Sequence, residues 1–283
     1  MFGSHLSIAG GMHLAILKAQ ELGMDTVQVF TKNQQQWKSK PLETSAIAEW
    51  KNHLGNAKFK QTVSHDSYLI NLASPDDKLW QASIALFIEE LTRCDQLGIP
   101  WLVAHPGAHV GSGEEKGLTR IASALDRIHK DLPDSTTITC LEITAGQGTC
   151  LGCKLEHLAE IIDQSKHPER LAVCLDTAHL FAAGYDFRGK KYAALVKDIE
   201  KTVGLDRIKV LHLNDSKKEL GSRVDRHDHI GRGHIGLEGF EGWMKDKRWH
   251  KVPKILETPK DGTDEKGRDW DLANLEALRS LMG

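Results

Sequence analysis

The sequence predicts an α/β protein that folds as a single (β/α)8 TIM barrel over residues 1–283. Short apolar runs of β character alternate eight times with amphipathic helical stretches, which indicates parallel strands with helices on the outside. The chain length suits one barrel, and side chains of the metal-binding type stand at the ends of successive runs. An open doubly wound sheet is disfavoured, because Gly10-Gly11 does not supply the G-x-G-x-x-G fingerprint of dinucleotide-binding sheets.

The expected strands are short apolar runs bounded by turn residues. In chain order they cover residues 3–8, 26–30, 61–65, 101–105, 137–143, 171–176, 208–213 and 254–258. The expected helices have apolar residues at helical spacing and cover residues 11–22, 43–55, 77–97, 115–131, 154–164, 190–203, 237–246 and 269–281. Glycine favours the left-handed backbone of a helix C-cap, so four glycines are expected to end helices: Gly23, Gly55, Gly98 and Gly204.

The composition is that of an ordinary soluble protein, with 40% hydrophobic residues, 27% charged residues and a net charge of −2. No apolar run approaches the roughly 20 residues that span a bilayer, and the first residues lack a signal-peptide pattern. We therefore expect a cytoplasmic protein with no membrane partner. The charge excludes a globally basic nucleic-acid binder, but not a protein that grips phosphates with bound cations and a local basic loop.

The cysteines indicate reduced thiols, because their number is odd and two of the five lie in expected strands. Cys150-L-G-Cys153 has the spacing of half a zinc ribbon or of a redox motif. The sequence contains no second C-x-x-C, and no pair of histidines follows at zinc-finger spacing. We therefore expect a structural role for this pair.

Nine side chains with metal-binding chemistry follow the expected strands or lie in the loop after the seventh strand. They are His65, His105, Glu142, Asp176, His179, His212, Asp225, His227 and Glu257. Because all strand C-termini of a parallel barrel open on one face, these scattered residues are expected to converge. Such a cluster is too polar to bury without partners, and imidazole and carboxylate both bind borderline divalent cations such as Zn²⁺.

The number of candidate ligands points to two or three ions, since a catalytic zinc usually takes three protein ligands. The irregular stretch 214–236 is long for a compact domain, which is typical of a functional loop. It adds five cations beside the cluster: Lys217, Lys218, Arg223, Arg226 and Arg232. A multi-metal site with a basic rim suits phosphoryl transfer, because paired metals polarise a phosphate and activate water.

Several long sequence blocks carry a family resemblance. They are G-S-His5-L-S-I-A-G-G, F-T-K-N-Q-Q-Q-W (30–37), His65-D-S-Y-L-I-N-L, A-His105-P-G, L-Glu142-I-T-A-G-Q-G, L-Asp176-T-A-His179, His212-L-N-D-S-K, Asp225-R-His227 and L-Glu257-T-P. Over nearly its whole length the chain resembles the endonuclease IV family of apurinic/apyrimidinic endonucleases. The resemblance implies a TIM-barrel DNA-repair hydrolase that cuts the phosphodiester 5′ to an abasic site, leaving 3′-hydroxyl and 5′-deoxyribose phosphate ends.

The resemblance also implies a trinuclear zinc site with shared ligands. One ion would be held by His65, His105 and Glu142. The second would be held by the bridging Glu142 with Asp176, His212 and Glu257, and the third by His179, Asp225 and His227. The water between the first two ions would be the nucleophile. Glu142 and Glu257 would be the catalytic carboxylates, with Glu257 orienting or deprotonating that water.

Double-stranded DNA with abasic sites is the partner that the resemblance implies, and with no obligate protein partner evident we expect a monomer. Tyr68 and Leu69 match the side chains that the family inserts at the lesion when the abasic nucleotide is flipped out. Arg226 and Arg232 are expected to contact phosphates. Gln35 stands where the family's best-known members carry Arg, so we expect DNA affinity to depend less on salt.

Two other functions fit the residues alone. Sugar isomerases and epimerases of the xylose-isomerase-like barrel group share the architecture and a Glu/Asp/His metal set, but they need fewer ions and fewer ligands. A non-catalytic lesion-binding protein could use its metals structurally, although structural zinc sites are usually Cys-rich and closed, whereas the expected site is cysteine-free. The metal content of the purified protein would separate the two enzyme classes.

Overall fold

The structure is a computed structural model that describes residues 1–282. Its main sheet has eight parallel strands in the order β1-β10-β7-β6-β5-β4-β3-β2. The strands are β1 (Phe2–Ser4), β2 (Gln28–Val29), β3 (Val63–His65), β4 (Trp101–Ala104), β5 (Ile138–Glu142), β6 (Leu171–Asp176), β7 (Ile208–His212) and β10 (Lys254–Leu256). A parallel bridge between His5 and Gln28 joins the two edges, so the sheet closes into the expected barrel.

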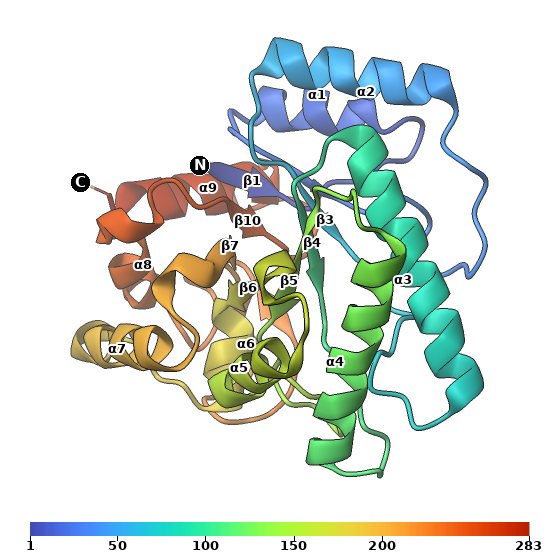
Figure 1. The fold of residues 1–283 in the computed structure, drawn as a ribbon. Helices are drawn as coiled ribbons and strands as arrows, with labels where there is room; N and C mark the ends of the chain where they lie inside the picture. The colour runs from blue at the N-terminus through green and yellow to red at the C-terminus, as the bar shows by residue number, and fades with distance from the viewer. Residues whose placement is uncertain (283) are drawn as a thin grey trace.

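The helices lie in the connections between successive strands and surround the sheet (Figure 1). They are α1 (His13–Glu21), α2 (Thr44–Ala57), α3 (Asp77–Leu97), α4 (Glu114–Asp131), α5 (Leu155–Gln164), α6 (Thr177–Ala183), α7 (Tyr192–Thr202), α8 (Glu241–Lys245) and α9 (Trp270–Ser280). Each of the eight strands and eight helices expected from the sequence has a counterpart. The predicted alternation, and with it the predicted fold class, is confirmed.

The structure differs from the expectation at three places. Helix α6 begins directly after β6, where the sequence predicts a loop. A two-stranded antiparallel hairpin, β8 (Asp215–Ser216) with β9 (His227–Asp228), lies inside the stretch expected to be irregular. Gly55 lies within α2 rather than at its end, because the left-handed C-cap position is taken by Lys58 with φ 59°. Gly98 does end α3, with φ 71°.

The pleat of the strands determines where the polar side chains lie. The barrel interior is filled by a small apolar layer of Val63, Val103, Cys140, Ala172, Cys174, Val210 and Ile255. Strand side chains alternate between faces, so the residue two positions later points to the same interior. Two positions after six of these come His65, His105, Glu142, Asp176, His212 and Glu257. These side chains therefore form the next layer, at the mouth formed by the strand C-termini.

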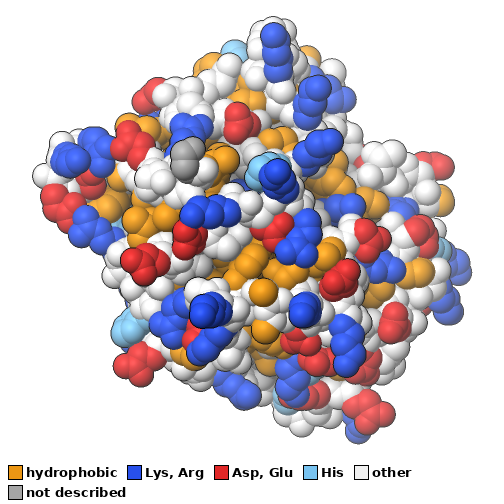
Figure 2. Space-filling view, turned by 90° about the vertical axis from the view of Figure 1, so that its left-hand side faces the viewer, with side chains coloured by type: hydrophobic (Ala, Val, Ile, Leu, Met, Phe, Trp, Pro, Cys, Tyr) orange, Lys and Arg blue, Asp and Glu red, His pale blue; other side chains and the backbone are white. Residues whose placement is uncertain are grey.

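The outer surface carries charges of both signs. On the face shown in Figure 2, Lys and Arg side chains are interspersed with Asp and Glu, in keeping with the net charge of −2. None of the helices within residues 1–282 has the length and apolar character needed to cross a bilayer.

Candidate metal centre

The barrel mouth brings metal-type donor atoms together in overlapping groups. Four sets have donor atoms that all lie within 4.8 Å of one another. They are His65/His105/Glu142, Glu142/Cys174/His212, Asp176/His179/His227 and Glu142/Asp176/His212/Glu257. Eight of the nine side chains expected from the sequence belong to these groups. The ninth, Asp225, lies beside them.

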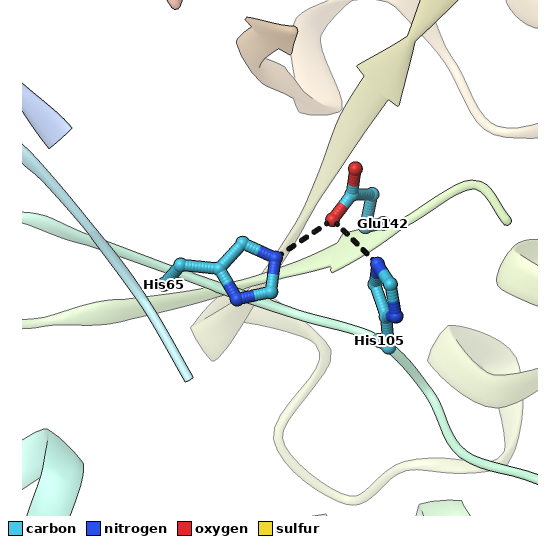
Figure 3. A group of neighbouring side chains, drawn as sticks. All are labelled: His65, His105 and Glu142. Carbon is cyan, nitrogen blue, oxygen red and sulfur yellow. Dashed lines mark hydrogen bonds and ion pairs between the residues drawn. The ribbon is translucent and has the colours of Figure 1, made fainter. Parts of the chain in front are cut away.

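The first group gathers around one carboxylate oxygen. His65 Nε2 lies 3.1 Å and His105 Nε2 lies 3.2 Å from Glu142 Oε2, and both imidazoles point at that atom from neighbouring strands (Figure 3). Two donors bound to the same tetrahedral zinc at about 2.0–2.1 Å lie about 3.3 Å apart. The spacing in this group therefore suits a shared cation.

Glu142 is fully buried and its two oxygens face different groups. While Oε2 faces His65 and His105, Oε1 lies 2.9 Å from His212 Nδ1 and 3.2 Å from His179 Nδ1. His212 Nδ1 also lies 3.0 Å from Glu257 Oε2. A carboxylate arranged in this way could bridge two cations, as the resemblance implies.

The third group differs in composition from the expected set. His179 Nε2 and His227 Nε2 lie 3.4 Å apart, and Asp176 Oδ2 lies 3.7 Å from His227 Nε2. Asp225, the expected carboxylate, is also within reach, because its two oxygens lie 3.2 Å from His179 Nε2 and 3.4 Å from His227 Nε2. The structure thus offers two carboxylates to this pair of imidazoles.

Four of the imidazoles have one ring nitrogen close to a backbone or amide oxygen that does not belong to the donor groups. His65 Nδ1 faces the Asp66 carbonyl oxygen at 3.0 Å, His179 Nδ1 faces the Ile143 carbonyl oxygen at 2.9 Å, and His227 Nδ1 faces the Glu257 carbonyl oxygen at 3.2 Å. His212 Nε2 faces Gln28 Oε1 at 2.9 Å. An N–H that donates to an outer oxygen leaves the other nitrogen as an inward acceptor, which is the arrangement of a metal-binding histidine. The donor set fits zinc.

The buried carboxylates of the cluster favour positive charge beside them. Burial raises the pKa of Glu142, but the charges of His212 and His105 outweigh it and hold that pKa well below its usual value. Burial lowers the pKa of His65 and His179, but the neighbouring carboxylates raise both well above the ordinary value. The carboxylates of the cluster therefore stabilise positive charge on the imidazoles beside them. Bound metal ions would supply that positive charge instead.

The cluster opens into a cavity of about 310 Å³. Besides six of the expected ligands, its walls are formed by His5, Phe30, Tyr68, Thr258, Pro259 and Lys260. A larger hollow of about 630 Å³ beside α7 contains none of the expected ligands, so chemistry rather than size identifies the site.

One of the residues expected to contact DNA, Tyr68, lines this cavity. Tyr68 is 69% exposed and packs edge-on against Phe30, with ring centroids 5.7 Å apart. Leu69 is half-buried and packs against the main hydrophobic core, and Gln35 is exposed. Among the residues expected to contact DNA, Tyr68 is thus one that lines the cavity and is also exposed.

The two arginines expected to contact phosphates have different surroundings. Arg226 is exposed, and its guanidinium donates to the backbone oxygen of Asp225 at 2.6 Å. Arg232 is also exposed, but it forms an ion pair with Glu265 at 2.6 Å, which neutralises much of its charge. Of the two, Arg226 presents the less compensated charge.

Sequence reasoning assigned no role to several residues that support the cluster. Gln28 donates from Nε2 to Glu257 Oε1 at 2.6 Å, and Asn214 donates from Nδ2 to Asp176 Oδ2 at 2.6 Å. His5 lies 3.4 Å from the same Glu257 oxygen. For Gln28 the sequence did offer a signal, because this polar residue stands inside an apolar strand, in V-Q-V. Cys174 also lies within the cluster, which corrects the expectation of a cysteine-free site, although burial raises its pKa to about 12.

Comparison with known proteins shows the family of the chain. Residues 16–281 match the family described as xylose isomerase-like TIM barrel. A relative from Chloroflexus aggregans, named probable endonuclease 4, is 47% identical over 99% of this chain and 97% of its own length. The crystal structure of endonuclease IV from Thermus thermophilus superposes with a TM-score of 0.86 at 32% identity, covering 99% of this chain and 98% of that one. A D-tagatose 3-epimerase-like protein (TM-score 0.76, 18% identity, 99% and 96% covered) shares the fold alone. The chain therefore belongs to the endonuclease IV family of TIM barrels.

Proposed function

We propose that this protein is a zinc-dependent DNA-repair endonuclease that hydrolyses the phosphodiester 5′ to an abasic site and leaves 3′-hydroxyl and 5′-deoxyribose phosphate ends. One observation carries the proposal: in a member of the endonuclease IV family, the buried Glu142 turns one oxygen to each of two donor groups, and a third group adjoins them. Three adjoining groups of nitrogen and oxygen donors support three zinc ions per chain.

Each ion is assigned to one donor group. His65, His105 and Glu142 would hold the first, and Glu142 with Asp176, His212 and Glu257 would hold the second. His179, His227 and Asp225 would hold the third ion. Asp176 lies near His227 and offers this ion a second carboxylate. Bound zinc would polarise the scissile phosphate and lower the pKa of a water molecule.

The chain's own residues would orient the reacting groups. Glu257 Oε1 accepts the hydrogen bond from Gln28 Nε2, which leaves Oε2 on the cluster side, 3.0 Å from His212. The Glu257 backbone N–H donates to Asn214 Oδ1 at 2.7 Å. With both its backbone and one oxygen fixed, Glu257 is suited to orient the attacking water and to accept its proton at Oε2.

Lesion recognition is assigned to the mouth of the cavity. Tyr68 would enter the base stack where a base is missing, because unstacking is least costly at a damaged site. Leu69 would support Tyr68 from the rim, and Gln35 would contact the same region of the DNA. Arg226 and, more weakly, Arg232 would contact phosphates, which position the duplex without identifying the lesion.

A nicking assay on end-labelled duplex DNA with one abasic site tests the proposal. The zinc-loaded protein is expected to cut 5′ to the site, a chelator is expected to abolish the cut, and intact duplex is the control. Metal analysis should find near three zinc per chain. Cleavage on the 3′ side with a borohydride-trappable intermediate would reject hydrolysis, because that chemistry uses an amine. One or two Mn²⁺ or Mg²⁺ without nicking would favour a sugar epimerase.

A further inference from the structure

The segment of residues 31–40 carries Gln35 and has no helix or strand of its own. It runs beside α3 in the connection between β2 and α2 (Figure 1). Gln35, Trp37 and Lys38 in its middle are exposed. An exposed irregular segment of this kind populates many conformations unless side chains fix it.

One buried guanidinium fixes both ends of the segment. Arg93 on α3 is 7% exposed. Its Nε donates to the Thr31 carbonyl oxygen at 3.1 Å, a bond reinforced by Nη2, and its Nη1 donates to the Lys40 carbonyl oxygen at 3.1 Å. The rigid, planar fork of one arginine therefore closes residues 31–40 into a loop, whereas a lysine ammonium lacks this fixed arrangement of donors.

Two neighbouring carboxylates on α3 strengthen both ends of this loop. Glu90, three residues before Arg93, accepts a hydrogen bond from Thr31 Oγ1 at 3.0 Å, and Glu89 accepts one from Ser39 Oγ. Within residues 1–282, every hydrogen bond of the Arg93 side chain ends in the segment, on Thr31, Ser39 or Lys40. Loss of Arg93 would therefore loosen the loop rather than the barrel.

A second tie joins this loop to the one that carries Tyr68. Ser67 is buried, and its hydroxyl donates to the Gln34 carbonyl oxygen at 2.6 Å while it accepts the Leu69 backbone N–H at 3.3 Å. The residues next to Gln34 and Ser67 in sequence are Gln35 and Tyr68. Gln35 and Tyr68, two of the side chains assigned to lesion recognition, thus stand on loops that are hydrogen-bonded to each other.

We infer that Arg93 is a positioning residue for lesion recognition. By closing the loop of residues 31–40, it holds Gln35 on the side of the molecule that carries Tyr68. The inference rests on the proposed function and deepens it. Arg93 itself touches neither the metal-type side chains nor the cavity wall, so its loss is expected to change DNA binding and not the chemical step.

Trypsin tests the loop closure without any DNA. Lys38 is exposed in the middle of the segment and precedes Ser39, whereas Lys40 precedes Pro41 and is a poor site. In folded Arg93→Lys, cleavage after Lys38 is expected to be about tenfold faster than in the wild type, because proteolysis follows the population of the open loop. The substitution creates no new trypsin site.

Steady-state cleavage of abasic duplex tests the consequence. Arg93→Lys is expected to raise KM about tenfold with kcat and zinc content unchanged, since the loop would act on binding alone. Arg207→Lys is the matched control: Arg207 also donates to two backbone oxygens, of Pro168 (2.9 Å) and Leu171 (3.3 Å), but at the opposite end of the barrel. It should leave both KM and Lys38 cleavage unchanged.

Each outcome decides the inference. Unchanged cleavage after Lys38 in Arg93→Lys would show that Arg93 does not close the loop. Faster cleavage with unchanged KM would remove the loop from lesion recognition. If Arg93→Lys does not fold, Ser67→Ala decides, because it removes the tie to Gln34, together with the long local bond from the Leu69 N–H, and should raise KM in the same way. A wild type that does not nick abasic DNA ends the recognition role and the proposed function together, while the trypsin result still reports on the loop.

Discussion

At the scale of single residues, orientation decides what each carboxylate does. Glu142 has both oxygens turned toward imidazoles, so it is placed to bridge. Glu257 has one oxygen occupied by Gln28 and the other facing His212, so it is placed to act on one side only. Both are glutamates at strand ends, and in the sequence only the family resemblance distinguishes them. Their difference comes from the hydrogen bonds around them.

Glu257→Gln is expected to lower the rate of cleavage of abasic DNA by about 100–10,000-fold, because it removes the assigned proton acceptor. Glutamine keeps the shape of the side chain, and the barrel core below the mouth is unchanged, so the melting temperature should change little. Nicking kinetics with circular dichroism measures both. Most of the activity surviving in Glu257→Gln would contradict the assigned role, and Glu142→Gln, expected to be at least as inactive, provides the comparison.

Tyr68→Ala is expected to weaken binding to abasic duplex by about 10–100-fold while binding to intact duplex changes little. The reason is that the exposed ring can enter a stack only where a base is missing. Fluorescence anisotropy with the two duplexes measures the difference, and Tyr68→Phe, which keeps the ring, is the control. Equal weakening for both duplexes, or the loss of a zinc ion, would make Tyr68 a support for His65, from which its ring centroid is 6.2 Å away.

At the scale of elements, strand ends were predictable and the connections above them were not. The six inward ligands follow from the two-residue period of the strands, which places each above an apolar interior residue such as Val63 or Ile255. Helix α6 was missed because Thr177–Ala183 is short and follows Asp176 with no turn residue between them. Asp176 itself caps this helix by accepting the His179 N–H at 2.8 Å. One side chain thus serves as helix cap and candidate ligand, which sequence spacing alone does not reveal.

Helix α4 carries a buried histidine that should make stability depend on pH. His129 is 1% exposed, and neither of its ring nitrogens has a hydrogen-bond partner among the described residues. Burial, helped by the charge of Arg170, lowers its pKa from 6.5 to about 3. Below pH 6.5 this histidine is therefore protonated in the unfolded chain but stays neutral in the folded protein. The free energy of unfolding consequently decreases as the pH falls from 6.5 toward 3.

Between pH 7 and pH 5 this single group should cost the wild type about 2 kcal/mol of unfolding free energy. In His129→Leu the loss over the same interval should be smaller by that amount, because leucine does not titrate and no hydrogen bond is removed. Urea titrations of both proteins at the two pH values measure it, and all other titrating groups cancel in the comparison. Parallel pH profiles would show that His129 titrates normally in the folded state.

At the scale of the whole molecule, the barrel is closed by its two ends. The first strand, β1, pairs with the last, β10, and His5 bridges to Gln28 to complete the ring. Near the end of the chain, Arg279 of α9 donates to the Gly23 backbone oxygen at 2.7 Å. The sequence predicts eight units, but not the contacts that close the ring beside the metal-type cluster, which are the His5–Gln28 bridge and the backbone hydrogen bonds on either side of it. These contacts join the two edge strands of the sheet, β1 and β2, and no local sequence pattern predicts them.

Closure by distant strands, with the donor groups spread over six of them, predicts how the protein responds to loss of its metals. A chelator is expected to lower the melting temperature of the zinc-loaded protein by about 10 °C, because metal that binds the folded state alone contributes about 4 kcal/mol at about 1,000 times its Kd. Removal leaves Glu142, Asp176 and Glu257 close together without the metal ions that would hold them in place. Unfolding should remain one transition, since the strands that carry the ligands also form the single ring.

Differential scanning calorimetry with and without the chelator measures both features, and addition of excess zinc should restore the original melting temperature. A chelator already saturated with zinc is the control for effects of the chelator itself. An unchanged melting temperature would mean that the clustered side chains hold no tightly bound metal in the folded protein. Two separate transitions in the chelated protein would mean that residues 1–283 unfold as more than one unit, because a ring whose first and last strands pair cannot lose one sector and keep the other.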